Sequence, residues 1–403
     1  MMEKSIFYIS KYAKSPEQGG ATRQYLYSKY FAKNNNKTIL ISSNSCGGQD
    51  LKITKAYQKK EVNKNFTHVI IKGRPINLGF SLKRIISWLF FEFRLYKYFK
   101  NNTLKKEDIV IVSSLSLLTF FTGVYLKKKY EMTLVVEVRD IWPQVLVDFK
   151  TISKRNLIYI LLSKIEKIGY KKADLIVGTM KNLPLHLDKI NLKLKDKFVY
   201  MPMGFDSDVV NTHKIDKSEK FIVGYAGTIG KANKVDLILE AAKLLKNNKK
   251  IEFRLLGDGP LKEEFKNVYE KFDNIFFYDK VMKKDVIKFL INCDVLVNPW
   301  EDKPIYRFGI SPNKWIDYMQ AGKPIIIPYN GYRNIIDEAE CGEFIETNNP
   351  ELFAETILKY SEKTEIELHM IGTKGKEYLL SNLTYDILAK KYLKHMANVQ
   401  VNS

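Results

Sequence analysis

The chain has 403 residues, of which 45% are apolar and 28% are charged, and its formal net charge is +21. This composition predicts a globular protein of two or three domains and excludes a disordered or collagen-like chain. The three cysteines, Cys46, Cys293 and Cys341, are odd in number and far apart. Their spacing excludes a disulfide framework or a zinc cluster and favours a reducing compartment.

The excess charge lies entirely in the first half of the chain. Residues 1–200 hold 37 lysines and arginines against 15 acids, whereas residues 201–403 hold 29 against 30. One half of the molecule is therefore expected to face an anionic partner, either nucleic acid or an anionic membrane.

The first half begins with a strand at 4–10 in place of a signal peptide. A loop with two glycines follows at 15–23, then a helix at 24–33 and a second strand at 37–42. Four further apolar runs alternate with helical stretches, as in a doubly wound parallel sheet. These runs lie at 67–72, 108–114, 133–140 and 173–179.

An uncharged stretch between Asp108 and Lys127 reaches the lower length limit of a membrane span. Serines, threonines and a glycine interrupt it, so the pattern favours a strand, a polar loop and the start of a helix.

The segment 197–208, KFVYMPMGFDSD, interrupts this rhythm, and the pattern then starts again. Strands are expected within 221–230, 251–260, 274–281, 294–299 and 324–329, with a helix at 235–246. Two Rossmann-like halves joined near residue 205 explain this order, with ligands bound at the carboxyl ends of the strands.

The stretch RFGISPNKWIDYMQAGKP, 307–324, predicts a helix with an anion at its start. Ser311 is a suitable N-cap, Pro312 a suitable first residue, and Gly322 ends the helix. Lys314 opposes the helix dipole unless an anion such as phosphate lies there. Asp317 falls on the same face one turn later, where a carboxylate can accept hydrogen bonds from ribose hydroxyls. The alternative is a solvated Lys314 and a structural Asp317.

Two glycine-rich loops follow strands of the same half. Gly227 and Gly230 precede Lys231 in GYAGTIGKAN, and Gly257 and Gly259 flank Asp258 in LLGDGP. Each loop alone is a weak motif, because such turns are common after strands. Together with the helix start they predict one opening of nucleotide size.

In order and spacing, GYAGTIGKAN, LEAA, LLGDGPLKEEF, FFYDKV and SPNKWIDYMQAGKPII resemble glycosyltransferase family 4. The closest likeness is to bacterial O-antigen and capsule enzymes such as N-acetyl-L-fucosamine transferases. GG at 19–20, VRDIWPQ around Asp140 and IEKIGYKKADLIVGT extend the resemblance over nearly the whole chain.

The resemblance implies the α/β GT-B fold, in which two Rossmann-like domains face a central cleft. An acceptor-binding, membrane-facing domain is expected at 1–204, with the helix at 384–403 crossing back to it. A donor-binding domain is expected at 205–383. The implied activity is metal-independent, retaining transfer of a hexose or N-acetylhexosamine from a nucleotide diphosphate sugar, with UDP as the expected carrier. A lipid-linked saccharide in surface polysaccharide synthesis would be the acceptor, and no separate cofactor is expected.

The resemblance also assigns donor-binding roles, residue by residue. Asp317 would hold the ribose, and Ser311, Asn313 and Lys314 the diphosphate. Thr228 and Lys231 would approach the phosphates from the first loop, and Gly19 and Gly20 from the other domain. Gly257, Asp258 and the backbone around Val281 would line the nucleobase.

Two departures from the family pattern bear on catalysis. The family carries two glutamates eight residues apart, where this chain has Gly309 and Asp317. Glu301 or Asp302 is the expected substitute, with Arg307 as an available cation. The family's loop Arg and Lys are here Thr228 and Asn233. Asp140 is the candidate to orient or deprotonate the acceptor, and its alternative is a loop-capping carboxylate.

The helix at 81–100 is predicted to lie either in a membrane interface or in the core of the sheet. The charge of its half favours the first, which would place the protein on the cytoplasmic face of the inner membrane. Asp206 and Asp208 resemble a metal motif only superficially, so no metal site is expected. Rival functions are a non-catalytic nucleotide-sugar scaffold and a nucleic-acid-binding protein, although no nucleic-acid module is visible.

Overall fold

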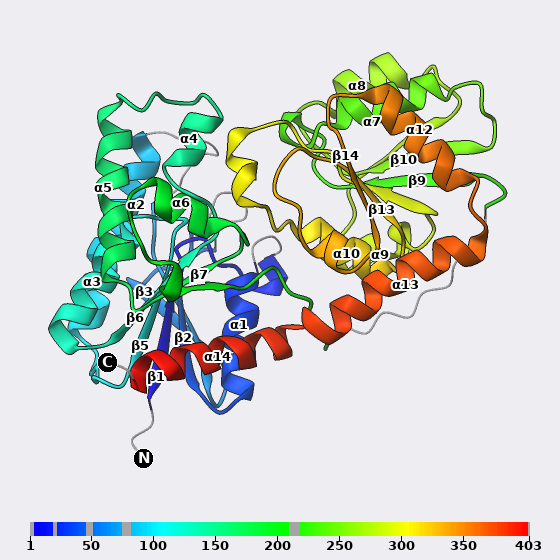
Figure 1. The fold of residues 1–403 in the computed structure, drawn as a ribbon. Helices are drawn as coiled ribbons and strands as arrows, with labels where there is room; N and C mark the ends of the chain where they lie inside the picture. The colour runs from blue at the N-terminus through cyan, green and yellow to red at the C-terminus, as the bar shows by residue number, and fades with distance from the viewer. Residues whose placement is uncertain (1–3, 19–21, 46–50, 75–81, 209–217, 402–403) are drawn as a thin grey trace. The chain divides into compact units, whose positions relative to one another are not determined.

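The computed structural model describes residues 4–18, 22–45, 51–74, 82–208 and 218–401. The chain divides into two compact units (Figure 1). Unit 1 comprises Met1–Pro202 and Tyr385–Ser403, and unit 2 comprises Met203–Thr384. The division falls two residues before the predicted domain boundary at 204/205.

Unit 1 is built on an eight-stranded sheet of order β3-β4-β2-β1-β5-β6-β7-β8, parallel except for the β3–β4 pair. Its strands are β1 Ser5–Ile9, β2 Lys37–Ser43, β3 Tyr57–Asn63, β4 Phe66–Ile71, β5 Ile109–Ser113, β6 Thr133–Val138, β7 Leu175–Gly178 and β8 Phe198–Tyr200. Its helices are α1 Arg23–Lys33, α2 Leu82–Lys100, α3 Thr119–Tyr130, α4 Gln144–Asp148, α5 Leu157–Lys172, α6 Leu183–Lys189 and α14 Tyr385–Val401. The uncharged stretch after Asp108 is therefore a strand, a loop and a helix, as predicted.

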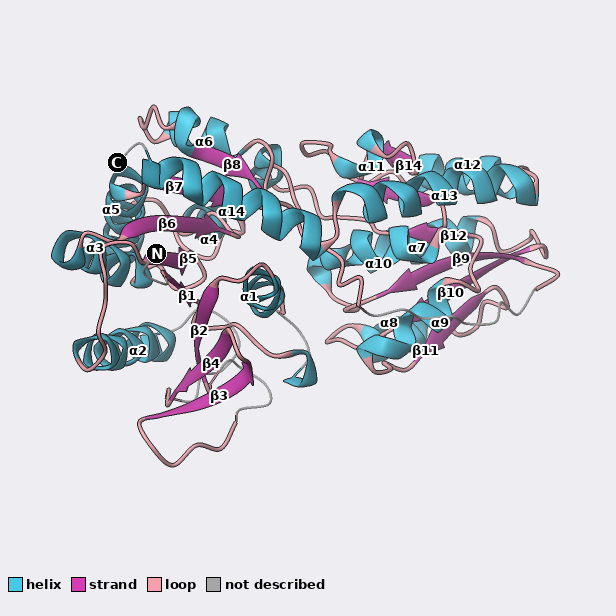
Figure 2. Ribbon diagram, turned by 90° about the horizontal axis from the view of Figure 1, so that it is seen from below, coloured by secondary structure: helices cyan, strands magenta, loops and turns pink. Residues whose placement is uncertain are grey.

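Helices cover both faces of this sheet (Figure 2). Side chains alternate along a strand, and on β1 Tyr8 belongs to the core cluster that includes α1 and α14. Phe7 points the other way and meets Phe99 of α2 edge-on, with ring centroids 5.6 Å apart. On this second face α3 packs between α2 and α5. No helix in the described part of the chain is long and apolar enough to cross a membrane.

A buried ion pair ties the first helix of unit 1 to its sheet. Arg23 of α1 and Glu137 of β6 are both fully buried, with Nε and Oε1 2.9 Å apart. Arg23 also donates to the carbonyls of Met201 and Pro202, where unit 1 passes into unit 2. The guanidinium lies 4.7 Å from the ring centre of Tyr27. These contacts satisfy a charge that would otherwise be costly to bury.

Unit 2 holds a six-stranded parallel sheet of order β11-β10-β9-β12-β13-β14. Relabelled by sequence, this is the order 3-2-1-4-5-6 of a Rossmann sheet, and β4-β2-β1-β5-β6-β7 of unit 1 has the same order. The strands are β9 Phe221–Ala226, β10 Ile251–Leu256, β11 Ile275–Tyr278, β12 Val295–Val297, β13 Ile325–Pro328 and β14 Gly342–Ile345. The helices are α7 Val235–Leu244, α8 Lys262–Tyr269, α9 Val286–Leu290, α10 Asn313–Ala321, α11 Ile335–Glu338, α12 Pro350–Ser361 and α13 Glu365–Asn382. The predicted α/β class with two Rossmann-like halves is confirmed.

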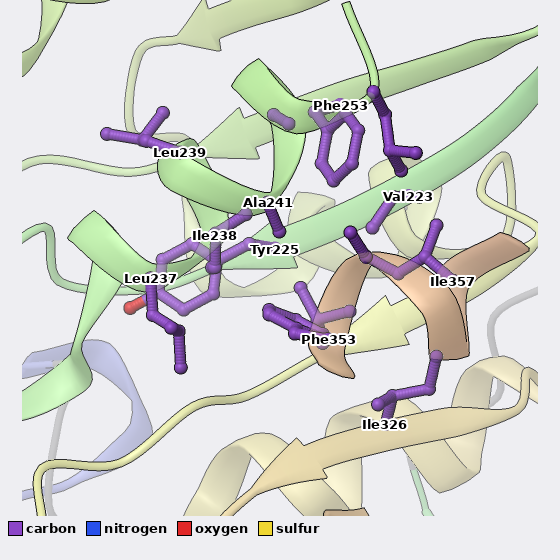
Figure 3. Packing of buried hydrophobic residues seen from close by; sticks show 14 of the residues in the cluster. Val223, Tyr225, Leu237, Ile238, Leu239, Ala241, Phe253, Ile326, Phe353 and Ile357 are labelled. Carbon is purple, nitrogen blue, oxygen red and sulfur yellow. The ribbon is translucent and has the colours of Figure 1, made fainter. Parts of the chain in front are cut away.

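The core of unit 2 lies between this sheet and the helices α7 and α12 (Figure 3). Val223 and Phe253 come from neighbouring strands, and Ile238 and Phe353 come from the two helices. All four are almost fully buried. This packing fixes β9 and β10 side by side, so the loops after them leave the sheet at one edge.

Candidate donor site in unit 2

The loops after β9 and β10 touch each other at two glycines. Gly227 and Gly257 have backbone φ values of 155° and 152°, which residues other than glycine rarely adopt. A Cβ on Gly257 would lie 1.9 Å from the carbonyl oxygen of Gly227. A Cβ on Gly227 would lie 2.2 Å from Cε of Lys314. Glycine at both positions therefore lets two loops and one lysine converge at the edge of the sheet.

Helix α10 brings the predicted phosphate-binding residues to the same edge. It begins at Asn313 after an extended Pro312, and it ends at Gly322, whose φ is 65°. The prediction that Ser311 caps the helix is wrong, because its hydroxyl accepts a hydrogen bond from the backbone N–H of Met203 at 2.9 Å. The first backbone N–H groups of α10 consequently receive no side-chain cap. Free amides at a helix start suit an anion.

Lys314 is held in place at this helix start. Its Nζ donates to the hydroxyl of Tyr225 at 2.8 Å and to Oδ1 of Asn233 at 2.7 Å. The ammonium also lies 4.4 Å from the ring centre of Tyr225. Desolvation lowers the pKa of Lys314 to about 7, against the opposing charge of Asp317. The solvated Lys314 of the alternative interpretation is therefore wrong, and this lysine would gain a proton's charge if a phosphate approached it.

Asp317 stands one turn further along α10 and forms an ion pair with Lys283. Its side chain is 22% exposed. Desolvation raises the pKa of the carboxyl above its usual range, while the charges of Lys283 and Lys314 oppose the rise. Lys283 belongs to a short 3₁₀ helix, Lys283–Asp285, that follows β11. A ligand hydroxyl that binds Asp317 would compete with this lysine.

These elements enclose a pocket of about 700 Å³. Its lining residues come from the ends of β9 and β10, the segment after β11 and the first turns of α10. They are Ala226, Gly227, Thr228, Leu256, Gly257, Asp258, Gly259, Lys280, Val281, Lys283, Val286, Asn313, Lys314 and Asp317. The pocket lies beside β9, where the strand order reverses, which is the expected ligand position in such a sheet.

Most of the predicted donor residues meet in this pocket. Seven of them line it, namely Thr228, Gly257, Asp258, Val281, Asn313, Lys314 and Asp317. Lys231 and Ser311 do not line it, and Gly19 and Gly20 lie outside the described residues. Lys231 is exposed in a 3₁₀ turn, and the amide of Asn233 in that turn holds Lys314 instead.

Sequence reasoning missed Lys280 and Lys283, which bring two more positive charges to the pocket. The signal was present in DKVMKKD after β11, a basic run directly at the carboxyl end of a strand. With Lys314, three lysines face a space in which Asp258 and Asp317 are the acids. Lys280 pairs with Asp258 and Lys283 with Asp317, so Lys314 leaves a formal excess of one positive charge, which favours an anionic ligand.

The predicted catalytic residues lie outside the lining of this pocket. Glu301 pairs with Lys303 at 2.7 Å, and the guanidinium of Arg307 lies 4.6 Å from the ring centre of Phe308. Gly309 has a φ of 95° and a ψ of 169°, a conformation almost restricted to glycine. A glutamate at position 309 is therefore disfavoured by the backbone itself.

Asp140 follows β6 in unit 1, at the carboxyl end of that strand. Its side chain is exposed, yet the surrounding protein desolvates the carboxyl and raises its pKa. The charges of Arg139 and Arg84 oppose this rise. Among the residues that the structure describes, no three His, Cys, Asp or Glu side chains gather as metal ligands.

Comparison with known proteins agrees with this architecture. Residues 210–378 match the family model for glycosyl transferases group 1. Over 303 residues the chain is 25% identical to the probable glycosyltransferase WbjE of Pseudomonas aeruginosa, which covers 72% of this chain and 74% of the relative. The matched residues lie within unit 2, which is therefore the part of the chain that is similar to group 1 glycosyl transferases.

Two solved structures show the same fold at low identity. Sucrose-phosphate synthase from Thermosynechococcus elongatus superposes with a TM-score of 0.75 at 14% identity, covering 99% of this chain and 100% of the other. Anabaena Alr3699/HepE, solved in complex with UDP and glucose, gives 0.65 at 11% identity, covering 98% and 100%. The chain has the GT-B fold.

Proposed function

We propose that the protein is a retaining glycosyltransferase that uses a nucleotide diphosphate sugar as donor, with UDP as the carrier. The observation that carries this proposal is the pocket of unit 2. It combines two carboxylates, three lysines, an uncapped helix start and two loops that meet at glycines. Its volume of about 700 Å³ lies within the range of small-molecule sites. The UDP bound by HepE supports the choice of carrier.

Each part of the donor is assigned to the residues whose chemistry suits it. Asp317 accepts hydrogen bonds from the ribose hydroxyls, and the backbone near Gly257 and Val281 lines the base. Lys314 and the first amides of α10 face the diphosphate, where negative charge grows as the sugar leaves. Cations and amides placed there in advance stabilise the leaving group without reorganisation. Lysines that supply this charge make the reaction independent of metal.

The acceptor is proposed to be a lipid-linked saccharide in bacterial surface polysaccharide assembly, O-antigen or capsule. The basic charge of residues 1–200 supports an anionic acceptor environment, on the cytoplasmic face of the inner membrane. Asp140 is proposed to orient or deprotonate the acceptor hydroxyl, and its raised pKa moves it toward the range of a general base. The hydroxyl enters on the side of the leaving group, which retains the anomeric configuration.

Titration calorimetry against UDP, ADP, GDP and their sugars tests the donor assignment, with and without a chelator. We expect UDP and a UDP-sugar to bind without added metal, and Asp317→Ala to weaken binding at least tenfold through the lost ribose contacts. Glu340→Gln, which alters a surface pair of unit 2 with Lys374, is the matched control and leaves binding unchanged. Equal affinity of Asp317→Ala for UDP would refute the site.

A scaffold that binds donor without turning it over is the second candidate, because Gly309 excludes the glutamate of the family. Transfer of labelled sugar from the bound donor to membrane lipids separates the two. Donor binding without transfer to any lipid-linked acceptor would favour the scaffold.

A further inference from the structure

Helix α2 shows two different faces. Trp88, Phe91 and Leu95 are fully buried against the sheet, which settles its place in the core. A second apolar row faces solvent along the same helix, and Leu89 and Phe93 in it are 57% and 55% exposed. The row consists of Ile86, Leu89, Phe93 and Tyr96, at the three- and four-residue spacing of one helix face.

The exposed apolar row continues over the neighbouring helices. Tyr96 of α2 meets Tyr125 of α3, with ring centroids 5.6 Å apart, and Phe121 of α3 is exposed. On α5 a second row is formed by Leu157, Leu161 and Ile168, and Leu157 is 81% exposed. Because α3 packs between α2 and α5, the two rows belong to one side of unit 1 (Figure 1). We call these residues the α2–α3–α5 surface.

The charged side chains on these three helices have a single sign. The helices hold twelve lysines and arginines, and Glu92 and Glu166 are their only acids. Neither acid is exposed, because Glu92 accepts hydrogen bonds from Thr119 and Thr122 and Glu166 is buried against His186. Every exposed charge on α2, α3 and α5 is therefore positive.

Basic residues are interleaved with the apolar rows. Lys97 and Lys100 follow Phe93 by four and seven residues, and the ammonium of Lys97 lies 4.4 Å from the ring centre of Phe93. Lys164 falls between Leu161 and Ile168 on α5 at the same helical spacing. An apolar row with interleaved cations matches the boundary between lipid headgroups and acyl chains.

We propose that the α2–α3–α5 surface docks the protein on an anionic lipid bilayer. Its exposed apolar side chains enter the headgroup region while the lysines contact lipid phosphates. A second copy of the chain fits this surface poorly, since symmetric pairing would oppose lysine to lysine. The inference deepens the proposed function by naming the partner that presents a lipid-linked acceptor, but docking itself needs no donor.

Vesicle co-sedimentation tests the proposal with the full chain and no nucleotide. One vesicle preparation is phosphatidylcholine alone, and the other contains an equal share of phosphatidylglycerol. We expect binding to the anionic vesicles, weakened by added salt. The double variant Leu89→Ser/Phe93→Ser and the independent variant Leu157→Ser/Leu161→Ser should each lower the partition coefficient about tenfold or more.

The matched control is Ile366→Ser/Met370→Ser on α13 of unit 2, whose side chains are 72% and 59% exposed. It removes comparable exposed apolar surface and should leave vesicle binding unchanged. Melting temperatures show whether each variant folds, and the two test variants alter different helices, so one remains informative if the other unfolds.

Several outcomes overturn the proposal. Equal vesicle binding by both test variants and the parent removes the surface assignment, and equal binding to both vesicle types removes the role of charge. Salt-sensitive binding of RNA or DNA without vesicle binding reassigns the surface to nucleic acid. A dimer that the test variants abolish reassigns it to a second copy. Failure of donor binding alone bears on the proposed function and leaves the docking result untouched.

Discussion

The two units share the strand order 3-2-1-4-5-6 around their central strands, yet they present different chemistry. Unit 2 places three lysines, Lys280, Lys283 and Lys314, around one pocket at the carboxyl ends of its strands. Residues 1–200 carry the whole excess charge of the protein, and in unit 1 much of it lies on the outer helices. On the two proposals made above, the same kind of sheet binds a small anion through its loops in unit 2 and an extended anionic surface through its helices in unit 1.

The largest expected effect is a loss of stability that is confined to unit 1. Glu137→Leu leaves the buried Arg23 without its partner, and we expect the free energy of unfolding of unit 1 to fall by about 3–5 kcal/mol. Differential scanning calorimetry should show the transition of unit 1 moving down while that of unit 2 stays. Asp273→Asn, which removes an exposed partner of Lys249 in unit 2, should move neither. A single transition that shifts as a whole would contradict this independence.

The next effect concerns donor binding alone. Lys314→Met removes a cation from the phosphate side of the pocket, and we expect UDP binding to lose about 2–3 kcal/mol. Lys231→Met removes a nearby lysine that does not line the pocket, so its effect on calorimetric affinity should be much smaller. Similar losses in both variants would mean that overall charge, and not position, attracts the donor.

A third prediction concerns position 309, where glycosyltransferase family 4 carries a glutamate and this chain has a glycine. Gly309→Glu forces a side chain onto a backbone with φ of 95°, so we expect unit 2 to lose about 1–3 kcal/mol of stability in chemical denaturation. Gly309→Ala should destabilise it for the same reason without adding charge. Turnover should not rise in either variant. A more active and equally stable Gly309→Glu would show that the site lacks only this carboxylate.

The smallest effect is a pH dependence specific to unit 2. Lys314 has a pKa of about 7 in the free protein, and a bound diphosphate raises it because the ammonium gains an anionic partner. The affinity for UDP is therefore highest below pH 7, where Lys314 already carries its proton in the free protein. Above pH 7 the affinity falls by up to about tenfold per pH unit, until the pH exceeds the raised pKa of Lys314 in the complex. Calorimetry from pH 7 upward measures this slope, and Lys314→Met should flatten it. A pH-independent affinity of the parent would refute the assignment.

Much of the fold was predictable from the sequence, because buried parallel strands appear as apolar runs and glycines follow them. The strand β3 was missed because five of its seven residues are polar and six of the seven are exposed, so no periodicity marks it. The helix 81–100 left two interpretations open, since its apolar residues surround most of the helix. The structure confirms the core interpretation for the face that carries Trp88, whereas Leu89 lies in solvent on a face for which the membrane interpretation stays a prediction.

The location of the site could be predicted from the sequence, but most of its side-chain contacts could not. The spacing of Asn313, Lys314 and Asp317 on one helix is local information, and all three line the pocket. The ion pair of Asp317 with Lys283 joins residues 34 positions apart, which no local pattern reports. Asn233 stands where the resembled family carries a lysine, so the sequence indicated a missing cation in this loop. In the structure its side-chain amide oxygen accepts a hydrogen bond from the ammonium of Lys314, so α10 supplies the positive charge that the loop lacks.

The position of α14 has a consequence for the order in which the protein can be completed during synthesis. Tyr385, Leu388 and Tyr392 belong to the core of unit 1, and Phe205 pairs with Leu383 where the chain enters and leaves unit 2. Unit 2 is thus a continuous segment with adjacent ends, whereas unit 1 lacks part of its core until the last helix emerges. At about 5–20 residues per second, the ribosome needs roughly 10–40 s to make residues 203–403. Unit 2 can fold in that interval, while the first 202 residues wait with the place of α14 uncovered.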